Sequence, residues 1–213
     1  QLPFWDDFSV NPIDNTKWSF FENLAVKDYS NNNAPSLNIV EFDGLNSNGN
    51  SYNHPNGYGE ADVLISDIIN MKNYENNQTV YMSFFWNFNI NGEHPDYQDS
   101  IKLEFMNKEN EWELVWYKTG GAENFIGNDF IFEILKITTQ FMHKNFKFKF
   151  SNIGNSEGPF DSWVLDYIYI DSNRNENDST FLDRTLSYTA KKIFKDYFSI
   201  PIKHFNKADE LSD

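Results

Sequence analysis

The sequence contains no cysteine among its 213 residues and no run of 18 or more apolar residues. The first absence excludes a disulfide framework, and the second excludes a membrane-spanning helix. Alanine is scarce, which argues against a helical bundle. Basic residues are also few: 17 Lys and Arg stand against 32 Asp and Glu, for a formal net charge of −15. Because this charge would repel a phosphate backbone, nucleic-acid binding is excluded as the main function.

Aromatic side chains are abundant, with 21 Phe, 11 Tyr and 6 Trp, and aromatic residues favour strands. Segments 146–150 and 101–105 alternate apolar with charged residues, so each presents one apolar and one polar face. Segment 79–88 is apolar on both faces apart from Ser83 and Asn87, which predicts a central strand. Further strands are predicted at residues 37–42, 111–117, 129–137 and 163–170.

This pattern predicts an all-β fold, a two-sheet antiparallel jelly-roll sandwich formed by residues 1–171. A parallel α/β sheet would need crossover helices, and the sequence shows no helical periodicity in this region. The character of the chain changes after Asp171, because residues 172–179 contain no apolar side chain. We therefore predict a second region, residues 172–213, that begins as a polar linker.

A short amphipathic helix is predicted near the end of this second region. Apolar residues recur there at helical spacing, at Ile193, Phe194, Tyr197 and Phe198, and the pattern stops before Pro201. The apolar side of this helix must be buried, either on the sandwich or on another protein, because aromatic patches of this kind are rarely left in water. Both alternatives stay open at this point.

The order of several strand motifs is similar to that of the MAM-type jelly roll. It resembles more closely the MAM-like β-sandwich of surface proteins from gliding, type IX-secreting bacteria. The motifs are Ala61–Ser66, Tyr81–Trp86, Asp99–Phe105, Trp112–Trp116, Phe146–Phe150 and Phe160–Asp171. They are signatures of strands rather than of chemistry, and the disulfide cysteines of animal MAM domains are absent. The resemblance implies a non-catalytic sandwich used for contact at a cell surface.

Together with the apolar tail, this resemblance gives the main functional expectation: a non-catalytic, exported module that binds other proteins. Its partners would be proteins of a cell-surface or outer-membrane assembly, linked to type IX secretion or gliding. Export is also suggested by the first residues, Gln1-Leu2-Pro3-Phe4, which look like a mature end left by signal-peptide removal or like an artificial boundary of the chain.

Jelly rolls of related type often hold a structural Ca²⁺ between their first and last strands. Asp6, Asp7 and Asp166 occupy the corresponding places in this sequence, with Glu60 and Asp62 as weaker candidates. Carboxylates suit this hard cation. Burying Asp166 unpaired between apolar neighbours would be costly, so it needs a cation, a hydrogen-bond donor or a position facing solvent. A structural Ca²⁺ is therefore one expectation, and a carboxylate that caps neighbouring amides is the alternative.

Carbohydrate binding is the main alternative function. Aromatic rings can stack on sugar faces, and Asn-rich loops can supply hydrogen bonds. The candidate ligand residues are Tyr97, Trp163 and Trp86. Most aromatic residues here lie within predicted strands, where core packing is the commoner explanation. Tyr97 is the freest candidate, because it lies in the loop 93–99.

A polysaccharide hydrolase is the third possibility, since glycosidases need two carboxylates at a defined separation. Glu111 and Glu113 have alternating spacing, and Trp112, Leu114 and Trp116 are expected to form the apolar face opposite them. That pattern indicates a solvated face of glutamates. The four histidines, at positions 54, 94, 143 and 204, show no metal-ligand spacing. The sequence therefore predicts no catalytic residues.

Overall fold

The computed structural model describes residues 1–10, 12–21, 24–28, 33–76, 79–88, 92–124, 127 and 129–180. Its strands are β1 (Phe4–Asp6), β2 (Trp18–Phe20), β3 (Ala25–Asp28), β4 (Asn38–Phe42), β5 (Tyr58–Ser66), β6 (Val80–Phe88), β7 (Ser100–Met106), β8 (Trp112–Thr119), β9 (Ile131–Ile137), β10 (Phe148–Asn155) and β11 (Trp163–Ser172). Four short 3₁₀ helices connect them: η1 (Pro55–Gly57), η2 (Lys72–Tyr74), η3 (Ala122–Asn124) and η4 (Thr139–Phe141).

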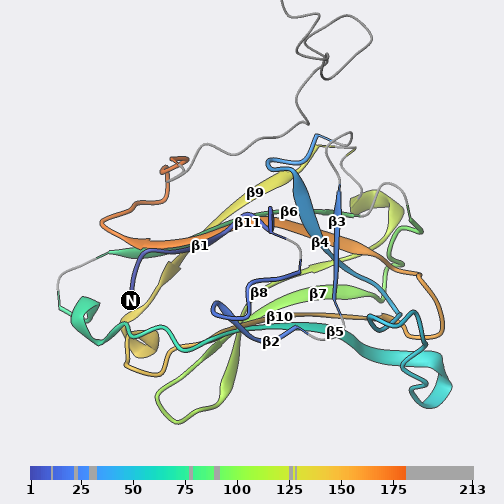
Figure 1. Ribbon diagram of the computed structural model, residues 1–213, viewed down its shortest axis with the longest axis horizontal. Coiled ribbons are helices and arrows are strands. Elements are labelled where there is room, and N and C mark those ends of the chain that lie inside the picture. Colours follow the sequence, from blue (N-terminus) through green and yellow to red (C-terminus); the bar gives the residue numbers. More distant parts are fainter. Residues whose placement is uncertain are drawn as a thin grey trace, which may run out of the picture.

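The strands form two antiparallel sheets that face each other as two layers (Figure 1). One sheet has the order β3-β4-β11-β6-β9, with β1 also paired to β11. The other has the order β2-β5-β10-β7-β8. Apart from the pairs β3-β4 and β7-β8, neighbouring strands are not consecutive in sequence, so each sheet is assembled mainly by long connections. This arrangement confirms the predicted all-β jelly-roll sandwich.

The core between the sheets is filled largely by aromatic rings. Phe84 of β6 meets Phe150 of β10 and Trp116 of β8 edge-to-face, with ring centroids 5.0 Å apart in both pairs. Trp18 stacks on Phe8 near the start of the chain. Edge-to-face pairs of this kind add roughly 0.5–1.5 kcal/mol each beyond the burial of their area. The aromatic composition is therefore explained by the packing between the two sheets.

A register shift in β8 changes which residues face the core. Leu103 pairs with Trp116, but its neighbour Glu104 pairs with Leu114, so one residue of β8 is left over. Trp116 consequently points into the core while Leu114 is exposed. Our expectation that Trp112, Leu114 and Trp116 share one apolar face was wrong, because a β-bulge reverses the alternation between them.

The buried carboxyl of Asp62 on β5 ties the sandwich to the chain that follows β4. Its Oδ2 accepts a hydrogen bond from the Asp43 backbone N–H at 2.8 Å, and its Oδ1 accepts one from the Tyr52 hydroxyl. Burial raises the pKa of Asp62 to about 8, against the opposing effects of these two donors. The group is therefore a structural carboxyl whose protonation is coupled to folding.

Beyond β11, the segment predicted as the start of a linker is attached to the first sheet. The side chain of Arg174 is buried and donates hydrogen bonds to the Ser83 hydroxyl at 3.0 Å and to the Tyr169 carbonyl at 3.1 Å. Its Nε also pairs with Asp178 at 2.8 Å. The predicted C-terminal helix, with Ile193, Phe194, Tyr197 and Phe198, lies outside the described residues. Among the described residues, no helix is long and apolar enough to cross a membrane.

Candidate functional site

A polar pocket of about 390 Å³ opens at one end of the sandwich. Three pieces of chain meet there: η1 with the start of β5, the loop before β7, and the connection between β10 and β11. The lining residues are Asn56, Gly57, Tyr58, Glu93, Asp96, Gln98, Asn155, Phe160 and Asp161. They combine carboxylates and amides with two aromatic rings, and none of them is basic.

The loop before β7 is held in shape by a turn between Asp96 and Asp99. The Asp99 backbone N–H donates to the Asp96 carbonyl at 2.9 Å, and the Asp96 N–H donates to Asp99 Oδ2 at 2.5 Å. Gly120, which follows β8, lies against this turn, since a Cβ there would be 2.4 Å from the Pro95 carbonyl oxygen. The close approach therefore requires glycine at this position.

Asp161 reaches the same place from the connection between β10 and β11. Its backbone adopts a positive φ of 54°, a conformation that Asp tolerates better than most residues. Its Oδ2 accepts a hydrogen bond from the Asn155 backbone N–H at 2.7 Å. The side chain is therefore anchored by the end of β10, although it belongs to the segment leading into β11.

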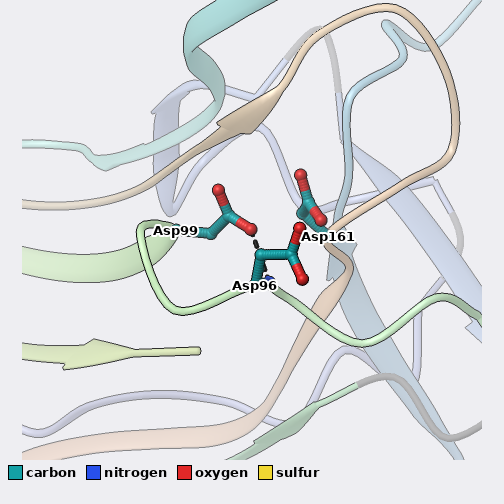
Figure 2. Close-up of side chains that lie close together, drawn as sticks. All are labelled: Asp96, Asp99 and Asp161. Atoms are coloured by element: carbon teal, nitrogen blue, oxygen red, sulfur yellow. Dashed lines mark hydrogen bonds between the residues drawn. The ribbon is translucent and has the colours of Figure 1, made fainter. Parts of the chain in front are cut away.

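The carboxylates of Asp96, Asp99 and Asp161 come together at the pocket. One oxygen from each lies within 4.8 Å of the other two, and Figure 2 shows the three side chains side by side. Asp99 and Asp161 are buried, whereas Asp96 is exposed. Burial, followed by the charge of Asp161, raises the pKa of Asp99 to about 7. The cluster concentrates negative charge in a partly dehydrated place.

Aromatic rings border this acidic cluster. The Tyr58 hydroxyl donates to the Gln98 carbonyl at 2.7 Å, which fixes the ring beside the turn. Burial and the charge of Asp99 raise the pKa of Tyr58 to about 12, so the hydroxyl stays protonated at neutral pH. Phe160 lines the pocket with 37% of its surface exposed, and Tyr97 on the neighbouring loop is 74% exposed. Flat faces are thus available next to hydrogen-bonding groups.

Of the three aromatic residues predicted to bind a ligand, only Tyr97 lies at the surface. Trp163 is fully buried and packs edge-to-face on Phe88 with centroids 4.8 Å apart. Trp86 is 4% exposed and donates its indole N–H to Glu133 at 3.2 Å. Trp163 is therefore a core residue and offers no ring face to a sugar. Trp86 is largely buried, but its edge lines a second pocket together with Tyr117 and Lys118.

The predicted calcium ligands Asp6, Asp7 and Asp166 do not gather into an acidic cluster among the described residues. Asp6 accepts the Trp18 indole N–H at 2.6 Å, and Asp7 accepts the Ser9 hydroxyl at 2.7 Å. Each of these two carboxylates thus has its own donor.

Asp166 is fully buried. Its Oδ2 accepts the Ser36 backbone N–H at 2.8 Å, and its Oδ1 accepts the Tyr167 N–H at 2.6 Å. Burial raises its pKa to about 8. A carboxyl that caps neighbouring amides, the alternative raised from the sequence, accounts for these contacts. The arrangement does not fit a metal held by the three carboxylates together.

The glutamates considered for hydrolysis have structural contacts. Glu113 accepts hydrogen bonds from Asn107 at 2.7 Å and from Gln140 at 3.0 Å, and Glu111 lies in the turn before β8. They therefore lie away from the pocket, in contacts that link β8 to neighbouring loops.

A second exposed surface lies on the outer face of β8. Tyr117 and Leu114 are both more than half exposed. Beside them, the Lys149 ammonium lies 5.1 Å from the Trp112 ring centroid and 2.7 Å from Glu104 Oε2. Trp112 and Leu114 line no described cavity, but Tyr117 lines a second pocket of about 440 Å³ together with Trp86, Lys118, Thr119, Asn124 and Ile131. This surface therefore provides a comparison site for binding experiments.

Asp96, Asp99 and Asp161 were not predicted as a group from the sequence. The spacing of Asp96 and Asp99 around Tyr97 in a Pro-containing loop was a usable signal for two of them. Asp161 is 62 positions beyond Asp99, and no local pattern links it to that loop. Only the topology, which places the end of β10 next to the start of β7, brings the third carboxylate into the cluster.

No family model matches the chain, and no curated protein matches it. Solved structures match over most of its length. One is the CBM27-1 module of Caldicellulosiruptor saccharolyticus in complex with mannohexaose, at 13% identity and a TM-score of 0.45, covering 79% of this chain and 96% of the module. Another is the CBM22-1 xylan-binding domain of Xyn10C from Paenibacillus barcinonensis, at 6% identity and a TM-score of 0.44. The match covers 81% of this chain and 94% of that domain.

A third is the K1 cleaved adhesin domain of Lys-gingipain from Porphyromonas gingivalis, at 10% identity and a TM-score of 0.46, covering 82% of this chain and all of that one. These neighbours share a jelly-roll β-sandwich, which agrees with the fold described above. The finer MAM-like resemblance is not confirmed. At such low identity, the likeness concerns the fold.

The neighbours also correct our main functional expectation. We expected a protein-binding subunit of a surface assembly, whereas the matching structures are mainly carbohydrate-binding modules. Since the likeness is one of fold, binding in this protein has to be argued from its own pocket.

Proposed function

We propose that this protein is a carbohydrate-binding module whose binding site is the polar pocket at the end of the sandwich. The observation that carries the proposal is the combination found there: the aromatic rings of Tyr58 and Phe160 lie next to carboxylate and amide side chains. The exposed Tyr97 stands between two lining residues, Asp96 and Gln98, in the same loop. Sugars present apolar C–H faces and polar hydroxyl edges. A pocket with both kinds of group can therefore hold one sugar unit through stacking and hydrogen bonds.

The hydrogen-bonding groups suit hydroxyls. A carboxylate such as Asp96 accepts from sugar hydroxyls, while the amides of Asn56 and Gln98 can both donate and accept. The negative charge of the protein discriminates between neutral and anionic glycans. Because the lining contains no basic residue and the chain has a formal charge of −15, an anionic polysaccharide would be repelled. The expected ligand is a neutral glycan.

The arrangement favours binding over catalysis. Glycoside hydrolysis needs a protonated carboxyl that reaches the glycosidic oxygen. Asp99 has the raised pKa suited to such an acid, but its side chain is fully buried and cannot touch a substrate. Asp96 is exposed but lies in the same tight cluster. We infer that the module is non-catalytic. Its export, expected from the sequence, stays a prediction.

Affinity electrophoresis and calorimetry against neutral polysaccharides, including xylan and mannan, test the proposal. The informative variants are Tyr97→Ala and Phe160→Ala, and Tyr117→Ala on the outer face of β8 is the matched control. Each pocket variant should weaken binding by about fivefold, since one stacking contact contributes about 1 kcal/mol. The control should bind like the wild type.

A wild-type chain that binds no neutral polysaccharide at all would refute the proposal. Binding that Tyr117→Ala weakens while Tyr97→Ala and Phe160→Ala leave it unchanged would move the site to the outer face of β8. Circular dichroism of each variant separates a binding defect from unfolding. Hydrolysis products in the same incubations would instead revive the enzyme alternative.

A further inference from the structure

We propose that Asp96, Asp99 and Asp161 bind a Ca²⁺ ion at the polar pocket. The inference concerns the pocket of the proposed function, and it depends on that function only for its consequence for sugar binding. The three carboxylates come from two loops that the topology brings together, and one oxygen from each lies within 4.8 Å of the others (Figure 2). Oxygens bound to one Ca²⁺ at about 2.3–2.6 Å lie no more than about 5 Å apart.

The buried side chain of Asp99 supplies an independent argument for a cation. Asp99 is fully buried, and its Oδ2 accepts the Asp96 N–H. Its other oxygen, Oδ1, is also buried and has no hydrogen-bond partner among the described residues. A buried carboxylate oxygen without a partner is unfavourable, because it has lost water and gained nothing in return. A cation at the cluster supplies the missing interaction.

The surroundings leave the negative charge of the cluster uncompensated. In the part of the chain that the structure describes, no ion pair joins Asp96, Asp99 or Asp161 to a basic side chain. Glu93 lines the pocket together with Asp96 and Asp161, which adds a further carboxylate beside the cluster. Buried charges are normally paired or coordinate metals. Since no described basic side chain pairs with the cluster, a bound metal ion would keep its carboxylates ionised together.

The ligand chemistry selects the ion. All three groups offer carboxylate oxygen, with no histidine or thiol in the cluster, so a hard cation is favoured over zinc or copper. Two of the three are held in place before any ion arrives: Asp99 by the Asp96 N–H and Asp161 by the Asn155 N–H at 2.7 Å. Ca²⁺ takes six to eight oxygen ligands, so the positions left over would face the open pocket.

These remaining positions connect the ion to the proposed function. Water can fill them in the sugar-free protein, and two neighbouring hydroxyls of a sugar can replace that water. The ion would then orient the sugar while Phe160 and Tyr58 contact its ring faces. A cation also reduces the repulsion that the acidic lining exerts on electron-rich hydroxyl oxygens. Sugar binding would therefore be weaker after chelation.

Calcium titration of the full chain, without any sugar, tests the metal site directly. Isothermal calorimetry on chelator-treated protein should give one binding event per chain, and millimolar Ca²⁺ should raise the melting temperature. The most informative variant is Asp96→Asn, because the Asp96 side chain is exposed and only its backbone shapes the turn. The affinity for Ca²⁺ should fall by about tenfold or more with the loss of one charged ligand.

Asp7→Asn is the matched control, since Asp7 belongs to the calcium set expected from the sequence and lies away from the pocket. It should bind Ca²⁺ like the wild type. Two results would overturn the inference: no heat and no thermal shift with Ca²⁺ in the wild type, or an affinity for Ca²⁺ that Asp96→Asn leaves unchanged. If Asp7→Asn abolishes calcium binding instead, the ion belongs between the first and last strands.

The two proposals fail separately. Calcium binding without any glycan binding would retain the metal site and refute the carbohydrate function. Glycan binding that persists unchanged in chelator, in a chain that takes up no Ca²⁺, would retain the carbohydrate function and refute the metal site. Mg²⁺ is the comparison ion in both titrations, and it should bind more weakly because it accepts only near-ideal octahedral geometry.

Discussion

Replacing the buried carboxyl of Asp62 with an amide should remove a large pH dependence of stability. In Asp62→Asn, the amide oxygen can still accept the Asp43 N–H, and the amide nitrogen can donate to the Tyr52 oxygen, so both contacts survive. The variant loses only the ability to ionise. The substitution therefore isolates the free energy associated with one buried proton.

The size of the effect follows from the pKa of Asp62, which rises from 3.8 to about 8 in the folded protein. A carboxyl whose pKa is raised by folding contributes its full stabilisation of the folded protein below about pH 4. This stabilisation is lost as the pH rises through about 8. Between these pH values, the free energy of unfolding falls by about 1.4 kcal/mol per pH unit. The total difference would be roughly 6 kcal/mol as an upper limit.

Urea unfolding of both proteins between about pH 5 and 8 measures this difference. Relative to Asp62→Asn, the wild type should lose stability steadily as the pH rises. The exposed Asp67 provides a control, because Asp67→Asn should follow the wild-type curve. Parallel curves for the wild type and Asp62→Asn would refute the reasoning, because they would mean that Asp62 ionises without cost in the folded protein.

Further substitutions test other parts of the structure. Arg174→Met removes buried hydrogen bonds that hold the segment after β11 and should cost about 2–4 kcal/mol in urea unfolding; an unchanged midpoint would show that the segment does not depend on them. Gly120→Ala places a Cβ 2.4 Å from the Pro95 carbonyl oxygen, so stability should fall by about 1–3 kcal/mol and glycan binding should weaken as the turn moves. Trp163→Ala should lower the free energy of unfolding by about 3–5 kcal/mol, because the Trp163 ring fills the core. Tyr97 is exposed, so Tyr97→Ala should leave the melting temperature within about 2 °C of the wild type. Equal thermal shifts in the two variants would contradict this division between core and surface.

Much of the fold could be predicted from local patterns. Alternation in 101–105 corresponds to β7, and the apolar segment 79–88 contains the central strand β6. These patterns are readable because side chains alternate between faces with a period of two. The bulge between Leu114 and Trp116 was not predictable in the same way, since it depends on pairing with β7 rather than on the residues of β8 alone.

The candidate site was only partly predictable. The loop containing Tyr97 was identified from its polar composition, and the structure places it at the pocket rim. Asp161 could not be connected with it, because their proximity arises from sheet order across a large separation in sequence. The burial of Trp163 was not predictable for a related reason: the sequence does not tell which face of a strand is covered by the opposite sheet.

Nuclear magnetic resonance mapping of a neutral oligosaccharide titration, with Ca²⁺ present, tests the central claim most directly. If the pocket at the end of the sandwich binds the sugar, the largest amide shifts will fall in residues 56–58, 93–99 and 155–161, and chelating the Ca²⁺ will weaken them. Shifts concentrated on the outer face of β8, around Trp112 and Tyr117, or no shifts with any neutral glycan, would contradict the account.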